Sequence, residues 1–185
     1  MEEFDIRLMT DDYPLSGREV MDIVGYPVRI VTFNLIDQLD LEDLFLNDLC
    51  LINYLHEERF GHWCCLCRDG DTITYFNPSG NFIDDAREGI PDDYIEISNQ
   101  KQPHLLKLLY SHSKKNGGDY DIRYMDFPLQ SYNTNTCGRW CGLFMRYYLM
   151  GEENFIKLFS DKSNLDKMII DMTEPVLRGV RSKGY

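Results

Sequence analysis

Two β-prone runs joined by a tight turn constrain the fold of this chain more than any other sequence feature. Residues 61–67 are mostly apolar, residues 72–76 are rich in β-branched and aromatic side chains, and Asp69-Gly70 stands between them. This pattern predicts a β-hairpin. With Asp69-Gly70 as the centre of a type I′ turn, His62 faces Asn77 across the two strands. Directly paired side chains lie about 4.5–5.5 Å apart, so the hairpin should bring an imidazole to an amide.

A second group of polar residues precedes an apolar run that has the composition of a buried helix. Asn135 or Thr136 is the expected N-cap and Gly151 the expected stop, which places Cys137 in the first turn. Free amides and the helix dipole favour a thiolate there, and a neighbouring imidazolium would favour it further. Gln130, on the preceding loop, could hold its side-chain N–H₂ beside the backbone N–H of Cys137, which would give two donors for an oxyanion.

These elements resemble, in type and order, the adenovirus-type (adenain-like) cysteine proteases. That family includes relatives proposed as maturation proteases of virophages, Polinton-like elements and giant DNA viruses, and it is distantly similar to the SUMO-deconjugating proteases. The matches lie within residues 16–149 and are His62-Trp63, Phe76-Asn77-Pro78-Ser79-Gly80, Gln130 and Cys137-Gly138. The resemblance implies an α+β, papain-like or adenain-like fold, in which a central mixed sheet packs on a buried helix that begins at the nucleophile.

The same resemblance implies a cysteine endopeptidase that cleaves viral capsid or structural precursors after small, Gly-rich motifs during virion maturation. In this interpretation Cys137 is the nucleophile, His62 the base, Asn77 the orienter and Gln130 the oxyanion donor, while Trp63 borders the substrate cleft. Many family members carry Glu or Asp where this chain has Asn77, and a neutral amide orients the ring with less support for an imidazolium. We expect the protein in the virion and in the host-cell cytoplasm, at the viral factory.

Two other classes of function stay open at this stage. The first is a deconjugating protease for a ubiquitin-like modifier, which would use the same residues on a folded substrate. The second is a catalytically inactive capsid or scaffold protein that retains the fold. Cys141, one helical turn beyond Cys137, is the rival nucleophile, but it lacks the free amides of a helix N-terminus.

Composition and charge limit the domain count and the partners. With 185 residues and 43% hydrophobic side chains, we expect one domain, residues 1–185, and a monomer. The resemblance implies DNA and a small peptide as activators, but a net charge of −12 suits phosphate binding poorly. We therefore do not expect a DNA cofactor, and we keep the peptide as an expectation. Met1–Asp5 has no signal-peptide features, and the chain lacks a membrane-length apolar run, so neither secretion nor a membrane partner is expected.

Cysteine usage raises a metal hypothesis that the spacing does not favour. Cys64, Cys65 and Cys67 lie within one predicted strand, where neighbours alternate between faces, and no second Cys/His pair has finger-like spacing. Nor does the chain contain a Gly-rich phosphate loop followed by Lys and Ser or Thr. We therefore expect no metal, no cofactor and reduced thiols.

The other predicted elements follow from periodicity and from capping signals. A capping box formed by Ser16 and Glu19 should open a helix that ends near Gly25. Residues 84–102 are acidic and look irregular. The further strands are expected at 28–33, 50–56 and 122–127, and the further helices at 35–47, 105–115, 152–160 and 164–180.

Overall fold

The computed structural model describes residues 12–58 and 60–183, so Met1–Asp5 lies outside the described residues. The strands are β1 (Arg29–Thr32), β2 (Leu49–Leu55), β3 (Gly61–Asp69), β4 (Thr72–Phe76) and β5 (Asp121–Tyr124). The α-helices are α2 (Gly17–Val24), α3 (Asp92–Ile97), α4 (His104–His112), α5 (Cys137–Tyr147), α6 (Glu152–Lys157) and α7 (Leu165–Arg181). Short 3₁₀ helices are η1 (Phe33–Gln38), η2 (Glu42–Leu44), η3 (Asp85–Gly89), η4 (Lys114–Asn116) and η5 (Tyr148–Met150).

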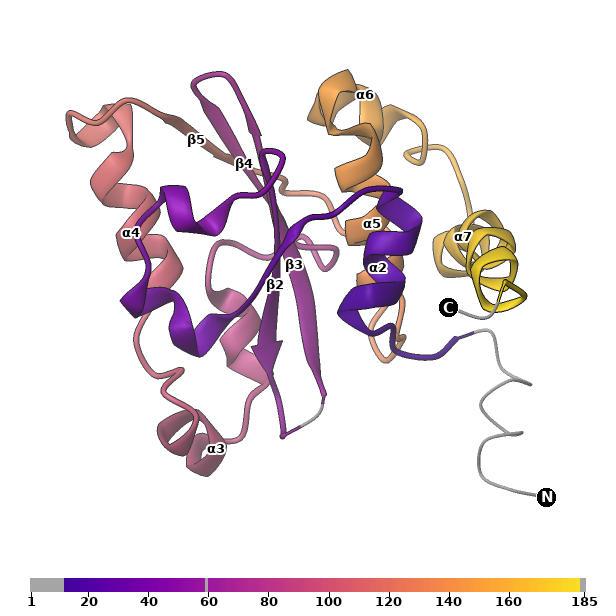
Figure 1. The fold of residues 1–185 in the computed structure, drawn as a ribbon, viewed down its shortest axis with the longest axis horizontal. Coiled ribbons are helices and arrows are strands. Elements are labelled where there is room, and N and C mark those ends of the chain that lie inside the picture. The colour runs from indigo at the N-terminus through magenta and orange to yellow at the C-terminus, as the bar shows by residue number, and fades with distance from the viewer. Residues whose placement is uncertain (1–11, 59, 184–185) are drawn as a thin grey trace.

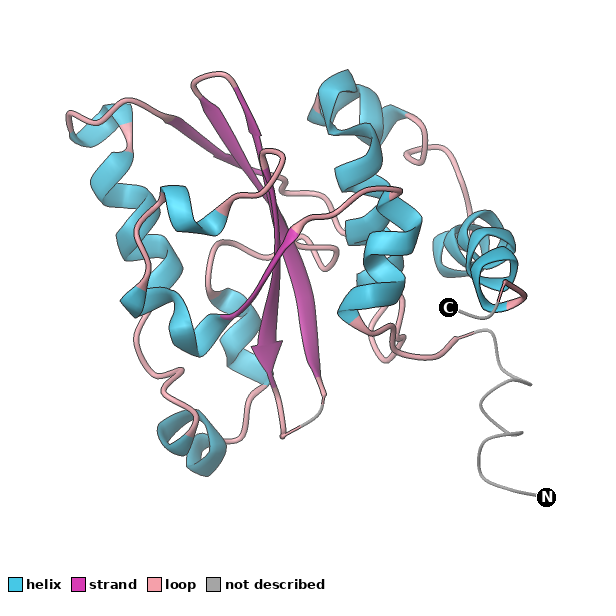
Figure 2. Cartoon of the chain, viewed as in Figure 1, coloured by secondary structure: helices cyan, strands magenta, loops and turns pink. Residues whose placement is uncertain are grey.

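The strands form one mixed sheet with helices on both faces. Its order is β1-β2-β3-β4-β5, with parallel pairs at the two edges and antiparallel pairs between them. Helices α3 and α4 lie on one side of this sheet, and α2, α5, α6 and α7 on the other (Figures 1 and 2). The predicted α+β class, the central mixed sheet and the buried helix that begins at Cys137 are therefore confirmed.

Strand β3 is buried on both faces, which accounts for its nearly continuous apolar sequence. Trp63, Cys65 and Cys67 belong to the core beneath α2 and α5. Cys64 and Leu66 belong to the core on the α4 side. The neighbouring cysteines thus point into different cores, as expected for alternating strand positions.

The predicted hairpin is present, but its predicted register is wrong. Asp69 pairs with Thr72, so Gly70 and Asp71 are the central turn residues, and Gly70 adopts the left-handed conformation with φ 56°. The pairing has shifted by two residues, and because side chains alternate with a period of two, every side chain keeps its predicted face. Strand β4 ends at Phe76, opposite Cys65, which leaves the first residues of β3 without a partner strand on that side.

Most other elements match the sequence patterns. Ser16 and Glu19 form the predicted capping box, and Gly25 ends α2 at φ 94°. The predicted helix at 35–47 is instead the two 3₁₀ helices η1 and η2, which bury Phe33, Ile36 and Leu44. Residues 84–102, expected to be irregular, contain η3 and α3, and the strand expected at 122–127 is the shorter β5.

Candidate active site

The imidazole of His62 is held by the amide of Asn77, the residue that follows β4. Nε2 of His62 lies 2.8 Å from Oδ1 of Asn77, and Asn77 is fully buried. The same Oδ1 accepts the backbone N–H of Ser79 at 3.0 Å, which fixes the orientation of the amide. Because an amide oxygen can only accept, Nε2 of His62 carries the proton, and Nδ1 is the nitrogen that can act as a base. The Cys64 thiol, two residues further along β3, interacts with the same ring.

Cys137 is the first residue of α5 and lies against the backbone of β3. Its side chain is 7% exposed, and the backbone N–H of Trp63 is within hydrogen-bonding reach of its sulfur. One turn deeper, Sγ of Cys141 donates to the carbonyl oxygen of Trp63 at 3.3 Å. The candidate nucleophile thus lies beside Trp63, the residue that follows His62. Within the described residues, 12–58 and 60–183, no hydrogen bond joins the Cys137 thiol to the His62 ring.

The ionisation of the two groups differs from the sequence-based expectation. Burial raises the pKa of the Cys137 thiol, and the backbone N–H groups of Trp63 and Gly138 oppose this without overcoming it. The expectation of a thiolate at Cys137 is therefore corrected: the loss of solvent raises the pKa of this thiol more than the free backbone N–H groups lower it. Burial also lowers the pKa of His62, but Cys64 and Asn77 outweigh that effect and leave the pKa raised. His62 is accordingly a stronger base, and the Cys137 thiol keeps its proton at neutral pH.

Gln130 is anchored to the turn that carries Asn77. The backbone N–H groups of Leu129 and Gln130 both donate to the carbonyl oxygen of Pro78 at 2.9 Å. Gly80 makes this approach possible, since it has φ 76° and a Cβ there would lie 2.8 Å from the nitrogen of Pro128. Nε2 of Gln130 donates to the carbonyl oxygen of Thr134 at 2.7 Å, so its pairing with the Cys137 amide stays a prediction.

Trp63 packs beneath the site. It is 8% exposed, and its indole N–H donates to the carbonyl oxygen of Leu15 at 2.8 Å. A Cβ on Gly138 would lie 3.2 Å from Cδ1 of this indole, so the glycine lets α5 approach β3 closely. The geometry shows a packing role for Trp63, and its role in substrate binding stays a prediction.

Two acidic residues that the sequence did not single out hold the loop between Gln130 and Cys137. Asp166 of α7 accepts hydrogen bonds from the N–H of Ser131 at 3.1 Å and from the hydroxyls of Thr134 and Thr136 at 3.1 and 2.5 Å. Thr136 is the N-cap residue, as predicted, but its hydroxyl serves Asp166 and does not cap the helix. Asp12 accepts the N–H of Asn135 at 2.9 Å. An acidic residue in the first turn of a helix is common, so the sequence offered no signal for this role.

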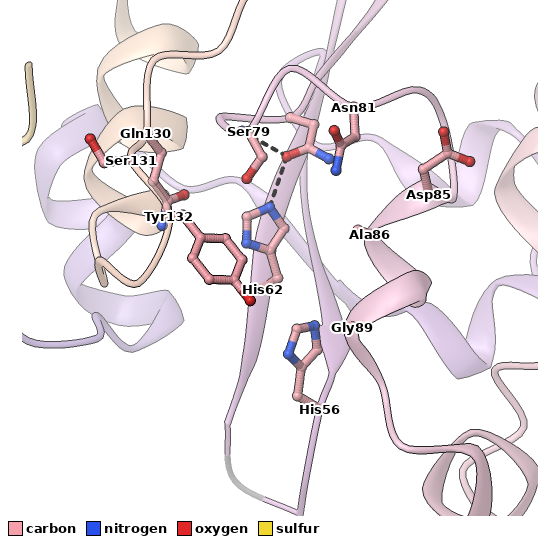
Figure 3. A pocket seen from close by; sticks show the side chains of 11 residues that line it. His56, His62, Ser79, Asn81, Asp85, Ala86, Gly89, Gln130, Ser131 and Tyr132 are labelled. Atoms are coloured by element: carbon pink, nitrogen blue, oxygen red, sulfur yellow. Dashed lines mark hydrogen bonds between the residues drawn. The ribbon is translucent and has the colours of Figure 1, made fainter.

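A cavity of about 350 Å³ opens beside the imidazole. Figure 3 shows its walls, which come from the turn after β2, from β3, from the turn after β4, from η3 and from the Gln130 loop. The cavity is lined by His56, His62, Asn77, Ser79, Asn81, Asp85, Ala86, Gly89, Gln130, Ser131 and Tyr132. Cys137 does not line it.

Comparison with known proteins establishes a relative among viral proteins. No protein-family model matches the chain. "Uncharacterized protein V9" of Sputnik virophage is 30% identical over 162 residues, which cover 85% of this chain and 89% of the relative. The chain belongs to the V9 family. The similarity extends over most of both proteins, but the name of the relative gives no activity.

Solved structures show only a low similarity to this V9-family protein. The SUMO protease Ulp1 with its catalytic cysteine oxidised to a sulfinic acid superposes with a TM-score of 0.43 at 16% identity, covering 97% of this chain and 84% of that one. The C-terminal Ulp1 protease domain in complex with Smt3, the yeast ortholog of SUMO, gives a TM-score of 0.44 at 19% identity, covering 92% and 77%. No helix formed by the described residues is long and apolar enough to span a membrane.

Proposed function

We propose that this V9-family protein is a cysteine endopeptidase with Cys137 as nucleophile and His62 as general base. The observation that carries the proposal is the 2.8 Å contact between His62 and Asn77, in a chain whose Cys137 begins a buried helix that packs on the strand of His62. Nucleophile, base and orienting group in this relation are the requirements of covalent acyl transfer.

In the acylation step, Sγ of Cys137 attacks the scissile carbonyl carbon while Nδ1 of His62 takes the thiol proton. The negative charge that develops on the carbonyl oxygen is held by the backbone N–H of Cys137 and by the side-chain N–H₂ of Gln130. The carbon–nitrogen bond then breaks, and His62 gives its proton to the leaving amine. The products of this half are a thioester on Cys137 and a free amine.

In the deacylation step, His62 accepts a proton from water as the water oxygen attacks the thioester carbonyl. The carbon–sulfur bond breaks, the carboxylic acid leaves and the proton returns to the sulfur. Asn77 keeps the ring in one tautomer through both halves and stabilises the imidazolium that forms between them. The net reaction is hydrolysis of one peptide bond.

The substrates in this proposal are viral capsid or structural precursor proteins, cleaved after small, Gly-rich motifs during virion maturation. The virophage source of the related V9 protein supports a viral setting, in the virion and the cytoplasm of the infected cell. Of the residues that carry the adenain-like resemblance, His62 and Asn77 are in contact, and Gln130 lines the same cavity, which supports the proposal. The protein acts as a monomer in this proposal, a peptide activator is compatible with it, and neither a metal nor DNA takes part.

Turnover of a Gly-Gly-aminocoumarin peptide tests the chemistry. Wild-type protein should release the fluorophore, and Cys137→Ala should lower kcat by at least about 10³-fold because no other group can form the thioester. Cys141→Ala tests the rival nucleophile, and Cys50→Ala is the matched control, since Cys50 is a fully buried cysteine in the α4-side core. A rate that survives Cys137→Ala would refute the mechanism.

Substrate class is tested with the same enzyme on two protein panels. We expect cleavage of capsid precursors that contain Gly-rich junctions and little cleavage of folded ubiquitin-like modifier fusions. Cleavage confined to the modifier fusions would reassign the protein as a deconjugating protease. No turnover of either panel or of the peptide, with unreactive Cys137, would leave the non-catalytic capsid or scaffold role.

A further inference from the structure

The cavity beside His62 presents hydrogen-bond acceptors that have no partner. The ring of His56 makes a hydrogen bond to the backbone of Ala86, and its buried Nε2 has none. Burial and the nearby His62 lower the pKa of His56, so the ring is neutral at pH 7. With its proton on the nitrogen that faces the Ala86 carbonyl, Nε2 of His56 is an acceptor.

Asp85 adds a negative charge to the wall of this cavity. In the part of the chain that the structure describes, no ion pair or side-chain hydrogen bond engages its carboxylate. The neighbouring cation does not neutralise it, because Arg87 donates to the backbone carbonyls of Asp84, Gln100 and Lys101. A carboxylate and a neutral imidazole acceptor together favour a ligand that is rich in donors and positively charged.

The position of the cavity relative to the proposed reaction decides which part of a substrate enters it. The leaving amine receives its proton from His62, so this half of the substrate must lie against the imidazole. His62 lines the cavity and Cys137 does not. The acyl half stays at the sulfur, and the chain that follows the scissile bond runs into the cavity, past Tyr132, which is 94% exposed at its rim.

We propose that this cavity is the leaving-group subsite, and that Asp85 and His56 select substrates with a basic side chain just after the scissile bond. The proposal rests on the proposed protease function and adds a specificity to it. Precursors with Lys or Arg at the first or second position of the released segment are then the preferred substrates, and precursors with Glu or Asp there are disfavoured by repulsion from Asp85.

Paired peptides that differ only after the scissile bond test the proposal. Internally quenched peptides with the same Gly-Gly segment carry Lys, Ala or Glu at the first two positions that follow it. For wild-type protein we expect kcat/KM to be about fivefold higher with Lys than with Glu, as for one partly exposed ion pair. Asp85→Asn should bring this ratio close to one, and Asp85→Lys should invert it.

The matched control is Asp119→Lys, which makes the same charge change at an exposed position that does not line the cavity. This variant should keep the wild-type Lys/Glu ratio. Equal ratios in Asp85→Lys and Asp119→Lys would overturn the subsite, because the preference would then follow net charge alone.

Gly-Gly-aminocoumarin separates this failure from failure of the protease proposal, because it has no residue after the scissile bond. If this substrate is turned over while the Asp85 variants keep the wild-type Lys/Glu ratio, the subsite proposal is wrong and the protease proposal stands. No turnover of any substrate overturns both.

Discussion

The two halves of the candidate site are built in different ways. His62 and Asn77 are 15 residues apart and are brought together by one hairpin and the turn that follows it. The half that contains Gln130 and Cys137 depends on distant carboxylates: Asp166 lies 30 residues beyond Thr136, and Asp12 lies 123 residues before Asn135. The proposed base is therefore positioned by local structure, whereas the proposed nucleophile and oxyanion donors are positioned by tertiary contacts.

In this comparison, removing the Asn77 amide, which orients His62, should have the largest effect on activity. Asn77→Ala should lower kcat/KM by about 10- to 100-fold, because the ring loses its fixed orientation. Asn77 raises the pKa of His62, so its loss lowers that pKa, and the acid limb of the pH profile should move to lower pH. A profile of kcat/KM from pH 5 to 9 measures both effects.

Asn77→Asp is the informative companion to this variant. A carboxylate in place of the amide should raise the pKa of His62 further and move the acid limb to higher pH. If the limb stays in place in both variants, the contact between His62 and Asn77 does not control the base.

Removing Asp166 should disturb the nucleophile half and spare the base. Asp166→Ala releases the N–H of Ser131 and the hydroxyls of Thr134 and Thr136, and we expect kcat to fall about tenfold with little change in KM. The acid limb should not move, because Asp166 does not contact His62. Asp171→Ala, which breaks an exposed pair with Lys167 on the same helix, should leave kcat unchanged. Equal effects of the two substitutions on kcat would show that Asp166 does not position the loop before Cys137.

Adding a single methyl group to the packing between α2 and α5, beneath Cys137, should have a smaller effect, which is on stability. A Cβ on Gly142 would lie 2.9 Å from Cγ2 of Ile23 in α2, so Gly142→Ala should lower the free energy of unfolding by about 1–2 kcal/mol through overpacking. Gly179 in α7 has open space around it, and Gly179→Ala should raise stability by about 0.5–1 kcal/mol through helix propensity. Urea denaturation compares the two, and a stabilising Gly142→Ala would show that the contact between α2 and α5 is loose.

The difference between local structure and tertiary contacts also decides how much of the molecule could be predicted from the sequence. The hairpin, the capping box at Ser16 and the helix at Cys137 carry local signals, and all three are present. The predicted turn is one residue off because Gly70 can adopt the left-handed conformation as either the first or the second central residue of a turn. Only packing selects between these two turns. The side chains of His62 and Asn77 meet nevertheless, because a shift of two residues preserves the faces.

What the sequence could not indicate depends on burial and on distant partners. Cys137 stands at a helix N-terminus, which favours a thiolate, but the extent to which the thiol is shielded from solvent appears only in the folded chain. The hydrogen bonds that Asp166 accepts from the loop likewise depend on how α7 packs against α5. Two 3₁₀ helices replace the helix predicted at 35–47. They bury Phe33, Ile36 and Leu44 and leave Leu35 exposed, so the buried positions do not follow the predicted helical stripe.

Mapping the alkylation of each cysteine by mass spectrometry tests the central claim most directly. Native wild-type and His62→Ala proteins are treated with limiting iodoacetamide from pH 5 to 9. The proposed pair predicts that Cys137 reacts ahead of the other cysteines, at a rate that rises with pH as His62 loses its proton and that falls in His62→Ala. A Cys137 that reacts no faster than Cys141, or at the same rate with and without His62, would contradict the assignment of nucleophile and base.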